Sequence, residues 1–219
     1  MTEQEWLDYA DDPRKMLAQL PPPVSGRKLR LLLCGCCRHF DHLLSDRRIL
    51  QAAEVCERYV DRRRATKEEL AAANAAVRAA CHDLEGPRPF ESLLALCLTM
   101  ATLERITGRD IAGLVLIPQR SGEIDNATWR EAHCELIREL FGNPFRPAAL
   151  APDWLRWHDG TVVKLARAIY NDRAFDWLPI LADALEEAGC SDPDILVHCR
   201  TGGEHVRGCW VVDAILGKT

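Results

Sequence analysis

The sequence lacks any long hydrophobic run. Apolar stretches such as Leu93–Cys97 and Gly113–Ile117 fall far short of the roughly 20 residues that a helix needs to cross a bilayer. The opening residues, MTEQEWLDYADD, are acidic and contain no basic segment followed by an apolar one, so they do not predict a secretory signal. We therefore expect no membrane partner and a cytoplasmic location.

An excess of basic charge is also missing. The chain has 28 Lys and Arg residues against 33 Asp and Glu residues, a net charge of -5, and this balance opposes broad association with nucleic acid. Arginines gather locally between Arg47 and Arg64, where we interpret them as a solvated face. We therefore expect a protein partner rather than a nucleic acid.

Cysteine, in contrast, is abundant, with ten residues in a chain of 219. Because no export signal accompanies them and many fall within helical patterns, the cysteines predict reduced thiols rather than a disulfide framework. A chain of this length with 47% hydrophobic residues can bury a core without a metal or a disulfide.

Apolar residues recur at helical spacing along most of the chain. After Ser25, for example, Leu29, Leu32, Cys36 and Cys37 lie on one stripe of an amphipathic helix. The fold class predicted is all-α, a multi-helix orthogonal or bundle-like array, with one short strand at 111–117 as an open alternative. Two short helices are expected within residues 1–20, and further helices near 26–44, 46–63, 66–84, 90–106, 129–141, 161–170, 177–188 and after 192.

Several helix starts carry capping signals. Thr2 with Glu5 and Thr66 with Glu69 fit the capping box, in which each side chain accepts a backbone hydrogen bond from the other residue. Asp12 and Asp192 each precede a proline, which is typical of a first helical turn.

The best candidate boundary is the segment 143–160, which holds three prolines and two tryptophans without a sustained period. The sequence thus predicts an N-terminal helical region at 1–142, a Pro/Trp-rich linker at 143–160 and a C-terminal helical region at 161–219. The two regions fold as separate domains or pack as one.

The tail segments NPFRPAALAPDWL, AIYNDRAFDWLPILADALEEAGC and DILVHCRTGGEHVRGCWVVDAILGK, with EWL and RKLRLLLCGCCR near the start, resemble a family of uncharacterised planctomycete-type bacterial proteins. The resemblance covers about half of the chain. It implies a helical module in the tail and brings no activity or catalytic residues with it.

The segment ILVHCRTGGEH, residues 195–205, is similar to the phosphate loop of cysteine-dependent phosphatases. Cys199 and Gly202 match that loop, but His205 occupies the position of its clamping arginine, and Arg207 follows two residues too late. A thiolate nucleophile needs nearby positive charge, and the phosphoryl group needs a bidentate donor. A helix start at Asp192-Pro193 also conflicts with the strand that the loop requires, so phosphatase chemistry ranks third.

A second interpretation groups soft metal ligands in the same tail. Zinc takes four Cys, His or carboxylate ligands in a tetrahedron, and His205 with Cys209 are four residues apart, on one face if the segment is helical. The alternative to a metal is packed thiols and surface histidines. The candidate zinc ligands are Cys190, His198, Cys199, His205 and Cys209.

A further cluster, Cys34, Cys36, Cys37 and His39, lies within one predicted helix. Residues one or two apart on a helix point in different directions, so these side chains need a partner such as Cys56 or Cys81 to converge. We expect them to be core residues.

No coherent catalytic set emerges, so we do not expect an enzyme. The leading hypothesis is a non-catalytic α-helical binding or adaptor module without a cofactor, in which Trp154 and Trp157 are candidate interface anchors or core residues. A zinc-binding module is the alternative.

Overall fold

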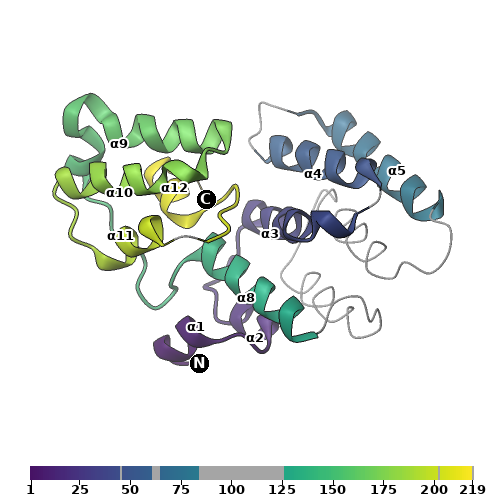
Figure 1. The fold of residues 1–219 in the computed structure, drawn as a ribbon, viewed down its shortest axis with the longest axis horizontal. Helices are drawn as coiled ribbons and strands as arrows, with labels where there is room; N and C mark the ends of the chain where they lie inside the picture. The colour runs from purple at the N-terminus through teal and green to yellow at the C-terminus, as the bar shows by residue number, and fades with distance from the viewer. Residues whose placement is uncertain (45, 61–64, 84–125, 202, 219) are drawn as a thin grey trace. The chain divides into compact units, whose positions relative to one another are not determined.

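The computed structural model describes residues 1–44, 46–60, 65–83, 126–201 and 203–218. Within these ranges every regular element is a helix and no strand occurs (Figure 1), so the all-α prediction is confirmed there. The helix expected at 90–106 and the alternative strand at 111–117 lie outside the described residues. The chain divides into two compact units, Met1–Arg138 and Glu139–Thr219.

The N-terminal unit is built from helices throughout its described part. Its capping boxes are confirmed, since Thr2 Oγ1 accepts from the Glu5 amide at 3.2 Å and the Glu5 carboxylate accepts from the Thr2 amide at 2.7 Å. Thr66 and Glu69 repeat both bonds. The elements are α1 (Glu3–Asp8), α2 (Pro13–Leu17), α3 (Gly26–His39), η1 (Asp41–Leu43), α4 (Arg47–Tyr59), α5 (Lys67–Asp83) and most of α8 (Asn126–Phe141), which continues past Arg138.

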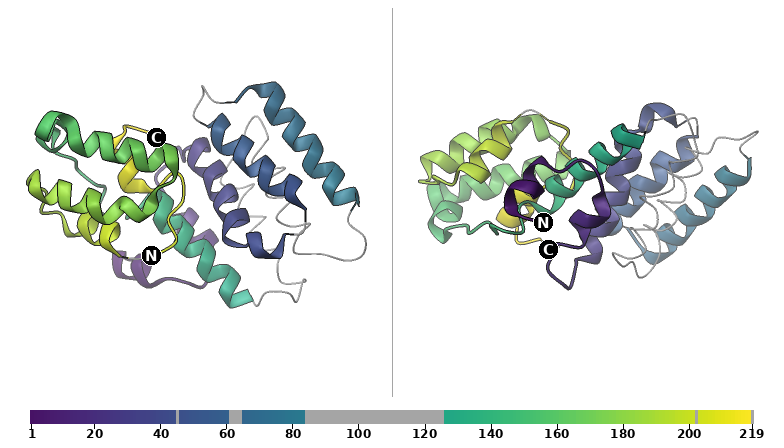
Figure 2. Two further views of the ribbon diagram at one scale, coloured as in Figure 1. Left: turned by 45° about the horizontal axis from the view of Figure 1, so that its top comes forward. Right: turned by 90° about the horizontal axis from the view of Figure 1, so that it is seen from below.

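Helices α3, α4 and α5 lie side by side (Figure 2). The apolar stripe predicted for α3 is buried, including Leu29, Leu32 and Cys36. Arg38 of α3 and Glu57 of α4 form a two-bonded ion pair at 2.6 and 3.0 Å, with the Glu57 side chain only 4% exposed. This pair therefore joins α3 to α4, with its carboxylate buried and its guanidinium 25% exposed.

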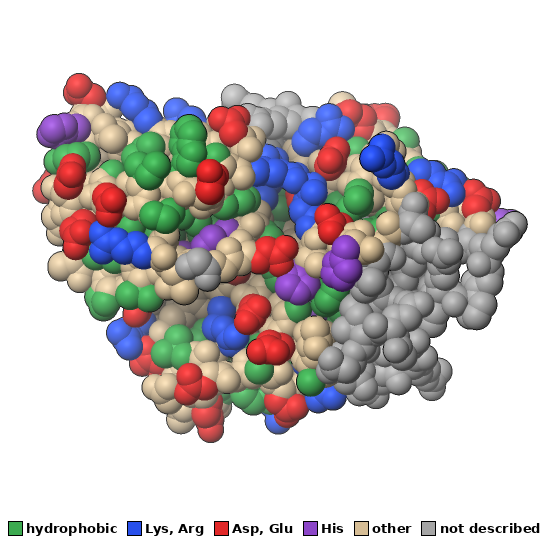
Figure 3. All heavy atoms as spheres, in the orientation of Figure 1, with side chains coloured by type: hydrophobic (Ala, Val, Ile, Leu, Met, Phe, Trp, Pro, Cys, Tyr) green, Lys and Arg blue, Asp and Glu red, His purple; other side chains and the backbone are tan. Residues whose placement is uncertain are grey.

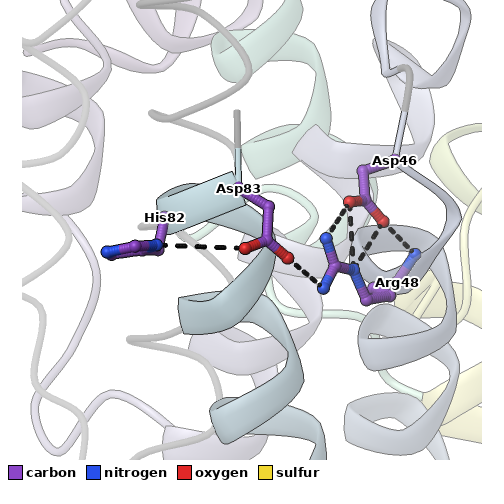
Figure 4. Close-up of polar contacts among 4 residues, drawn as sticks. All are labelled: Asp46, Arg48, His82 and Asp83. Atoms are coloured by element: carbon purple, nitrogen blue, oxygen red, sulfur yellow. Dashed lines mark hydrogen bonds and ion pairs between the residues drawn. The ribbon is translucent and has the colours of Figure 1, made fainter. Parts of the chain in front are cut away.

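A more exposed network joins the start of α4 to the end of α5. Arg48 bonds the carboxylate of Asp46 at 2.6 Å and that of Asp83 at 2.8 Å (Figure 4). His82 lies 3.9 Å from Asp83 but is 92% exposed. Because these groups face water, we expect a small contribution to stability.

The C-terminal unit consists of α9 (Pro152–Asp172), η3 (Phe175–Trp177), α10 (Leu178–Glu187), α11 (Pro193–Arg200) and α12 (Trp210–Ile215). Helix α10 packs against both α9 and α11, while α12 packs against α9 (Figures 1 and 2). One buried cluster contains residues from all four helices, including Val162, Leu181, Ile195 and Val211. The helix start predicted at Asp192 is confirmed, since its carboxylate caps α11.

The segment 143–160, expected to be a linker, lies wholly within the C-terminal unit. Its second half is helical because Pro152 begins α9, which extends across a kink where Trp157 to Gly160 leave helical geometry. The helix start expected at Thr161 is therefore the point where regular helix resumes after the kink.

Among the described helices, none has the length and apolar character that crossing a membrane requires. Part of the surface of the C-terminal unit, at the left of Figure 3, presents hydrophobic side chains interspersed with charges of both signs.

A candidate metal centre in the C-terminal unit

Four potential metal ligands converge in the C-terminal unit. Glu139 lies in the last turn of α8, His198 lies in α11, and His205 and Cys209 lie on the segment between α11 and α12. One ligand atom from each residue falls within 4.8 Å of the other three. Of the part of the chain that the structure describes, this is the one group of three or more His, Cys, Asp or Glu residues with such geometry.

The individual distances suit a tetrahedral zinc ion. His205 Nδ1 lies 3.0 Å from Glu139 Oε2, His198 Nε2 lies 3.3 Å from the same oxygen, and His198 Nε2 lies 3.2 Å from Cys209 Sγ. Zinc bonds of about 2.0–2.3 Å set neighbouring ligand atoms of a tetrahedron roughly 3.3–3.6 Å apart. These three edges would thus need to change by only a few tenths of an ångström, while the other three are at most 4.8 Å long and would have to contract where they exceed the tetrahedral edge.

The site is largely shielded from water. The side chains of Glu139, His205 and His198 are 7%, 11% and 18% exposed, and Cys209 is fully buried. Within the described residues, the ion pairs of Glu139 are those with His198 and His205, and its second oxygen, Oε1, accepts from the Val206 amide at 3.3 Å. The polar partners of the carboxylate in this part of the structure are therefore two imidazoles and one backbone amide.

The pKa values of the titratable groups in the cluster are shifted in different directions. Burial lowers the pKa of His198 more than the charge of Glu139 raises it. For His205, burial is the largest single influence and lowers the pKa, but the hydrogen bond and charge of Glu139, with a bond to the Thr201 backbone, together raise it above its ordinary value. Burial, then the charge of Glu139, raises the pKa of Cys209 well above its ordinary range, so without a metal this thiol keeps its proton.

The hydrogen bonds of this arrangement depend on the protonation of His198 Nε2. A neutral imidazole nitrogen carries either one proton or one lone pair. His198 Nε2 is close to both Glu139 and Cys209, so if it accepts from the thiol, it has no proton to donate to the carboxylate. If it donates instead, one proton serves two acceptors. A cation at the centre would satisfy all four ligand atoms at once.

His205 also interacts with the backbone of Thr201. A second hydrogen-bond partner of this kind helps to orient an imidazole ligand.

Three of the five predicted ligands, His198, His205 and Cys209, belong to the converging group, whereas Cys190 and Cys199 do not. Cys190 and Cys199 are part of the buried apolar cluster of the unit. Burial raises the pKa of Cys199 to about 12, which is the opposite of what a thiolate nucleophile needs.

Other features of the phosphatase interpretation also meet no support in the geometry. Cys199 lies in the helix α11 rather than after a strand. Arg207 is buried and donates to the backbone carbonyls of Tyr170 and Asn171 at 3.2 and 3.4 Å, so its guanidinium serves the fold.

Sequence reasoning missed Glu139, although a signal was present. Glu139 follows Leu136 by three residues and Ala132 by seven, which places it on the apolar stripe of its helix. A carboxylate on a buried face needs a compensating partner, and this position could have been added to the candidate ligands for that reason.

The cysteine cluster of α3 forms no metal group among the described residues. Cys34, Cys36 and Cys37 are fully buried, as expected for core residues. Cys36 Sγ instead lies 3.0 Å from His133 Nε2 of α8, within the N-terminal unit.

The two tryptophans proposed as anchors are partly buried. Trp154 and Trp157 both pack against the apolar cluster of the C-terminal unit, and Trp157 stacks on His158 at 4.1 Å between ring centroids. The most exposed large hydrophobic side chains of this unit are instead Val197 at 61%, Ile180 at 52% and Trp177 at 43%.

No family model matches the chain, and no curated protein or solved structure is significantly similar to it.

Proposed function

We propose that the C-terminal unit is a zinc-binding module whose ligands are Glu139, His198, His205 and Cys209. The observation that carries the proposal is the convergence of four ligand atoms of suitable chemistry within 4.8 Å in a buried setting. Imidazole and thiolate favour zinc and its neighbours among the transition metals over magnesium or calcium, which prefer oxygen ligands.

The proposed role of the metal is structural. Four protein ligands complete the tetrahedral coordination of a zinc ion and leave no position for water or substrate. Two of the four, His205 and Cys209, lie on the segment between Arg200 and Trp210, whose described residues have no regular secondary structure. A zinc ion would link this segment to the last turn of α8 through Glu139 and to α11 through His198.

Metal content of the purified full chain is the direct test. We expect one zinc per chain by elemental analysis, and a cobalt-loaded sample should show the absorption of a tetrahedral site with a thiolate-to-cobalt band. Cys209→Ser and His198→Gln should each lower the zinc content severely. Cys190→Ser is the matched control, since it removes a buried thiol outside the group and should keep the metal.

Two results would overturn the proposal. One is a folded protein without zinc after expression and purification in zinc-supplemented medium, combined with no tetrahedral cobalt spectrum. The other is equal zinc content in Cys209→Ser and Cys190→Ser. In either case the four side chains form a hydrogen-bonded network of imidazoles and carboxylate, and the metal has no part in it.

As a second proposal, the chain acts as a non-catalytic helical adaptor that binds another protein. The exposed Trp177, Ile180 and Val197 favour this function, because large apolar side chains at a surface are typical interface anchors. Trp177→Ala and Ile180→Ser should weaken capture of a binding partner while leaving thermal unfolding unchanged. Trp154→Ala and Trp157→Ala should lower stability instead, because their side chains pack on the core.

Two further expectations, a cytoplasmic location and a bacterial family, stay predictions. The described cysteines, nine in number, are free thiols, which suits a reducing compartment such as the cytoplasm. The resemblance to planctomycete-type proteins supports a bacterial helical module of the same kind.

A further inference from the structure

A cavity of about 470 Å³ lies in the C-terminal unit, apart from the four metal ligands. It is within the size range of small-molecule sites, about 300–1,000 Å³. Its walls come from the end of α8, the segment that follows it, the first turn of α9, the start of α11 and Trp210. This cavity belongs to no part of the zinc proposal, and the inference drawn from it does not depend on the metal.

Aromatic side chains form one part of the wall: Phe141, Trp154 and Trp210. Gly142 makes room for this arrangement, because a Cβ atom there would lie 3.0 Å from the Trp210 ring and the residue has a φ of +66°. A side chain at this position would therefore push the indole away from the cavity wall.

Acidic side chains form another part of the cavity wall. Asp192 and Asp194 both line the cavity, and Arg146 is the only basic side chain among its described lining residues. Asp192 caps α11 through Oδ1, and Asp194 meets Arg146 through Oδ2 at 3.5 Å. Among the described residues no hydrogen bond uses Oδ2 of Asp192 or Oδ1 of Asp194, so each oxygen can accept from a ligand.

We infer that this cavity binds an organic cation, an ammonium or guanidinium group carried on an apolar stem. Indole faces attract cations, and carboxylate oxygens accept charge-assisted hydrogen bonds from them. The first turn of α11 by itself would attract an anion, but two carboxylates at that turn reverse the sign of the local charge. The stem occupies the apolar wall, and the cationic group meets the carboxylates.

Such a cation comes from one of two sources, a free amine or a lysine or arginine side chain of another protein. The chemistry of recognition is the same for both. Binding is measured by titration calorimetry on the full chain, and the site is located from the indole N–H signals of Trp154 and Trp210 in nitrogen-edited NMR spectra. The probes are phenethylamine, its neutral analogue 2-phenylethanol, the anion phenylacetate, and a capped Gly-Lys-Gly peptide.

Phenethylamine should bind at least about tenfold more tightly than 2-phenylethanol, as expected of a cation–π contact combined with a carboxylate, and should shift both indole signals. The double variant Asp192→Asn/Asp194→Asn should lose that preference. It should also fold normally, because asparagine caps a helix as well as aspartate does. The control Asp176→Asn/Glu187→Gln removes the same charge elsewhere on the unit and should keep the preference.

Preferred binding of the lysine peptide would identify a protein side chain as the occupant, and preferred binding of phenethylamine would identify a free amine; both outcomes support the inference. Equal affinity for phenethylamine and 2-phenylethanol, tighter binding of phenylacetate, or no binding of either cationic probe would overturn it.

Discussion

Buried imidazoles occupy two different environments in this chain. His133 contacts the Trp129 ring and carbonyl and the Cys36 thiol, and burial lowers its pKa to about 4. His205 faces the carboxylate of Glu139, which more than offsets burial and leaves its pKa raised. The same residue type is thus held neutral in one unit and available for charge in the other.

Because the pKa of His133 is lowered, we expect the N-terminal unit to lose stability in mild acid. An unfolded histidine titrates near pH 6.5, while folded His133 binds its proton only near pH 4. Between these values the unfolded chain binds one more proton, so the free energy of unfolding should fall as the pH falls, by up to about 3 kcal/mol. Urea unfolding at several pH values measures this loss.

The variant His133→Gln should show a smaller loss across the same pH window, since it has no group to titrate there. His82→Gln is the control, because His82 is 92% exposed and its replacement should leave the pH dependence unchanged. Equal slopes for His133→Gln and the original chain would show that burial of His133 is not responsible.

Among the elements, α3 and α4 depend on a polar contact as well as on apolar packing. The Arg38–Glu57 pair is two-bonded and its carboxylate is nearly dry, whereas the Arg48–Asp46–Asp83 network is open to solvent. Removing one partner of a buried pair is much more damaging than removing one partner of an exposed pair.

Arg38→Met should therefore lower the free energy of unfolding by about 3 kcal/mol. Arg48→Met, the exposed counterpart, should lower it by less than about 1 kcal/mol. A combined Arg38→Met/Glu57→Leu variant should recover part of the loss, because the buried carboxylate is gone as well. Chemical unfolding of the three variants checks the order, and similar losses for Arg38→Met and Arg48→Met would contradict it.

Local signals predicted many of the helices, because their starts and ends are chemically marked. The capping boxes at Thr2 and Thr66 and the cap at Asp192 lie where the sequence placed them. The course of α9 could not be predicted, since its kink depends on left-handed backbone at His158 and Asp159, which no local pattern requires. Of the candidate metal centre, only the ligands that are close together in the sequence were predicted, because Glu139 lies 66 residues before His205.

At the scale of the whole molecule, the zinc proposal predicts that the metal stabilises only one of the two units. On the zinc proposal the ion binds only the folded C-terminal unit, so a free zinc concentration of 100 times Kd should stabilise that unit by about 2.7 kcal/mol. Hydrogen exchange with zinc and with a chelator should differ in peptides from residues 139–218 and agree in peptides from residues 1–138. The variant Cys209→Ser should show no difference in either range. Equal protection of both ranges by zinc would contradict a site confined to the C-terminal unit.

The spacing of the ligands also has a consequence for biosynthesis. His198 and Cys209 are 11 positions apart, but Glu139 precedes His205 by 66. At a synthesis rate of about 5–20 residues per second, the ribosome completes Glu139 several seconds before the other three ligands. On the zinc proposal, a nascent chain that already contains α8 cannot complete the metal site until His198, His205 and Cys209 have been translated.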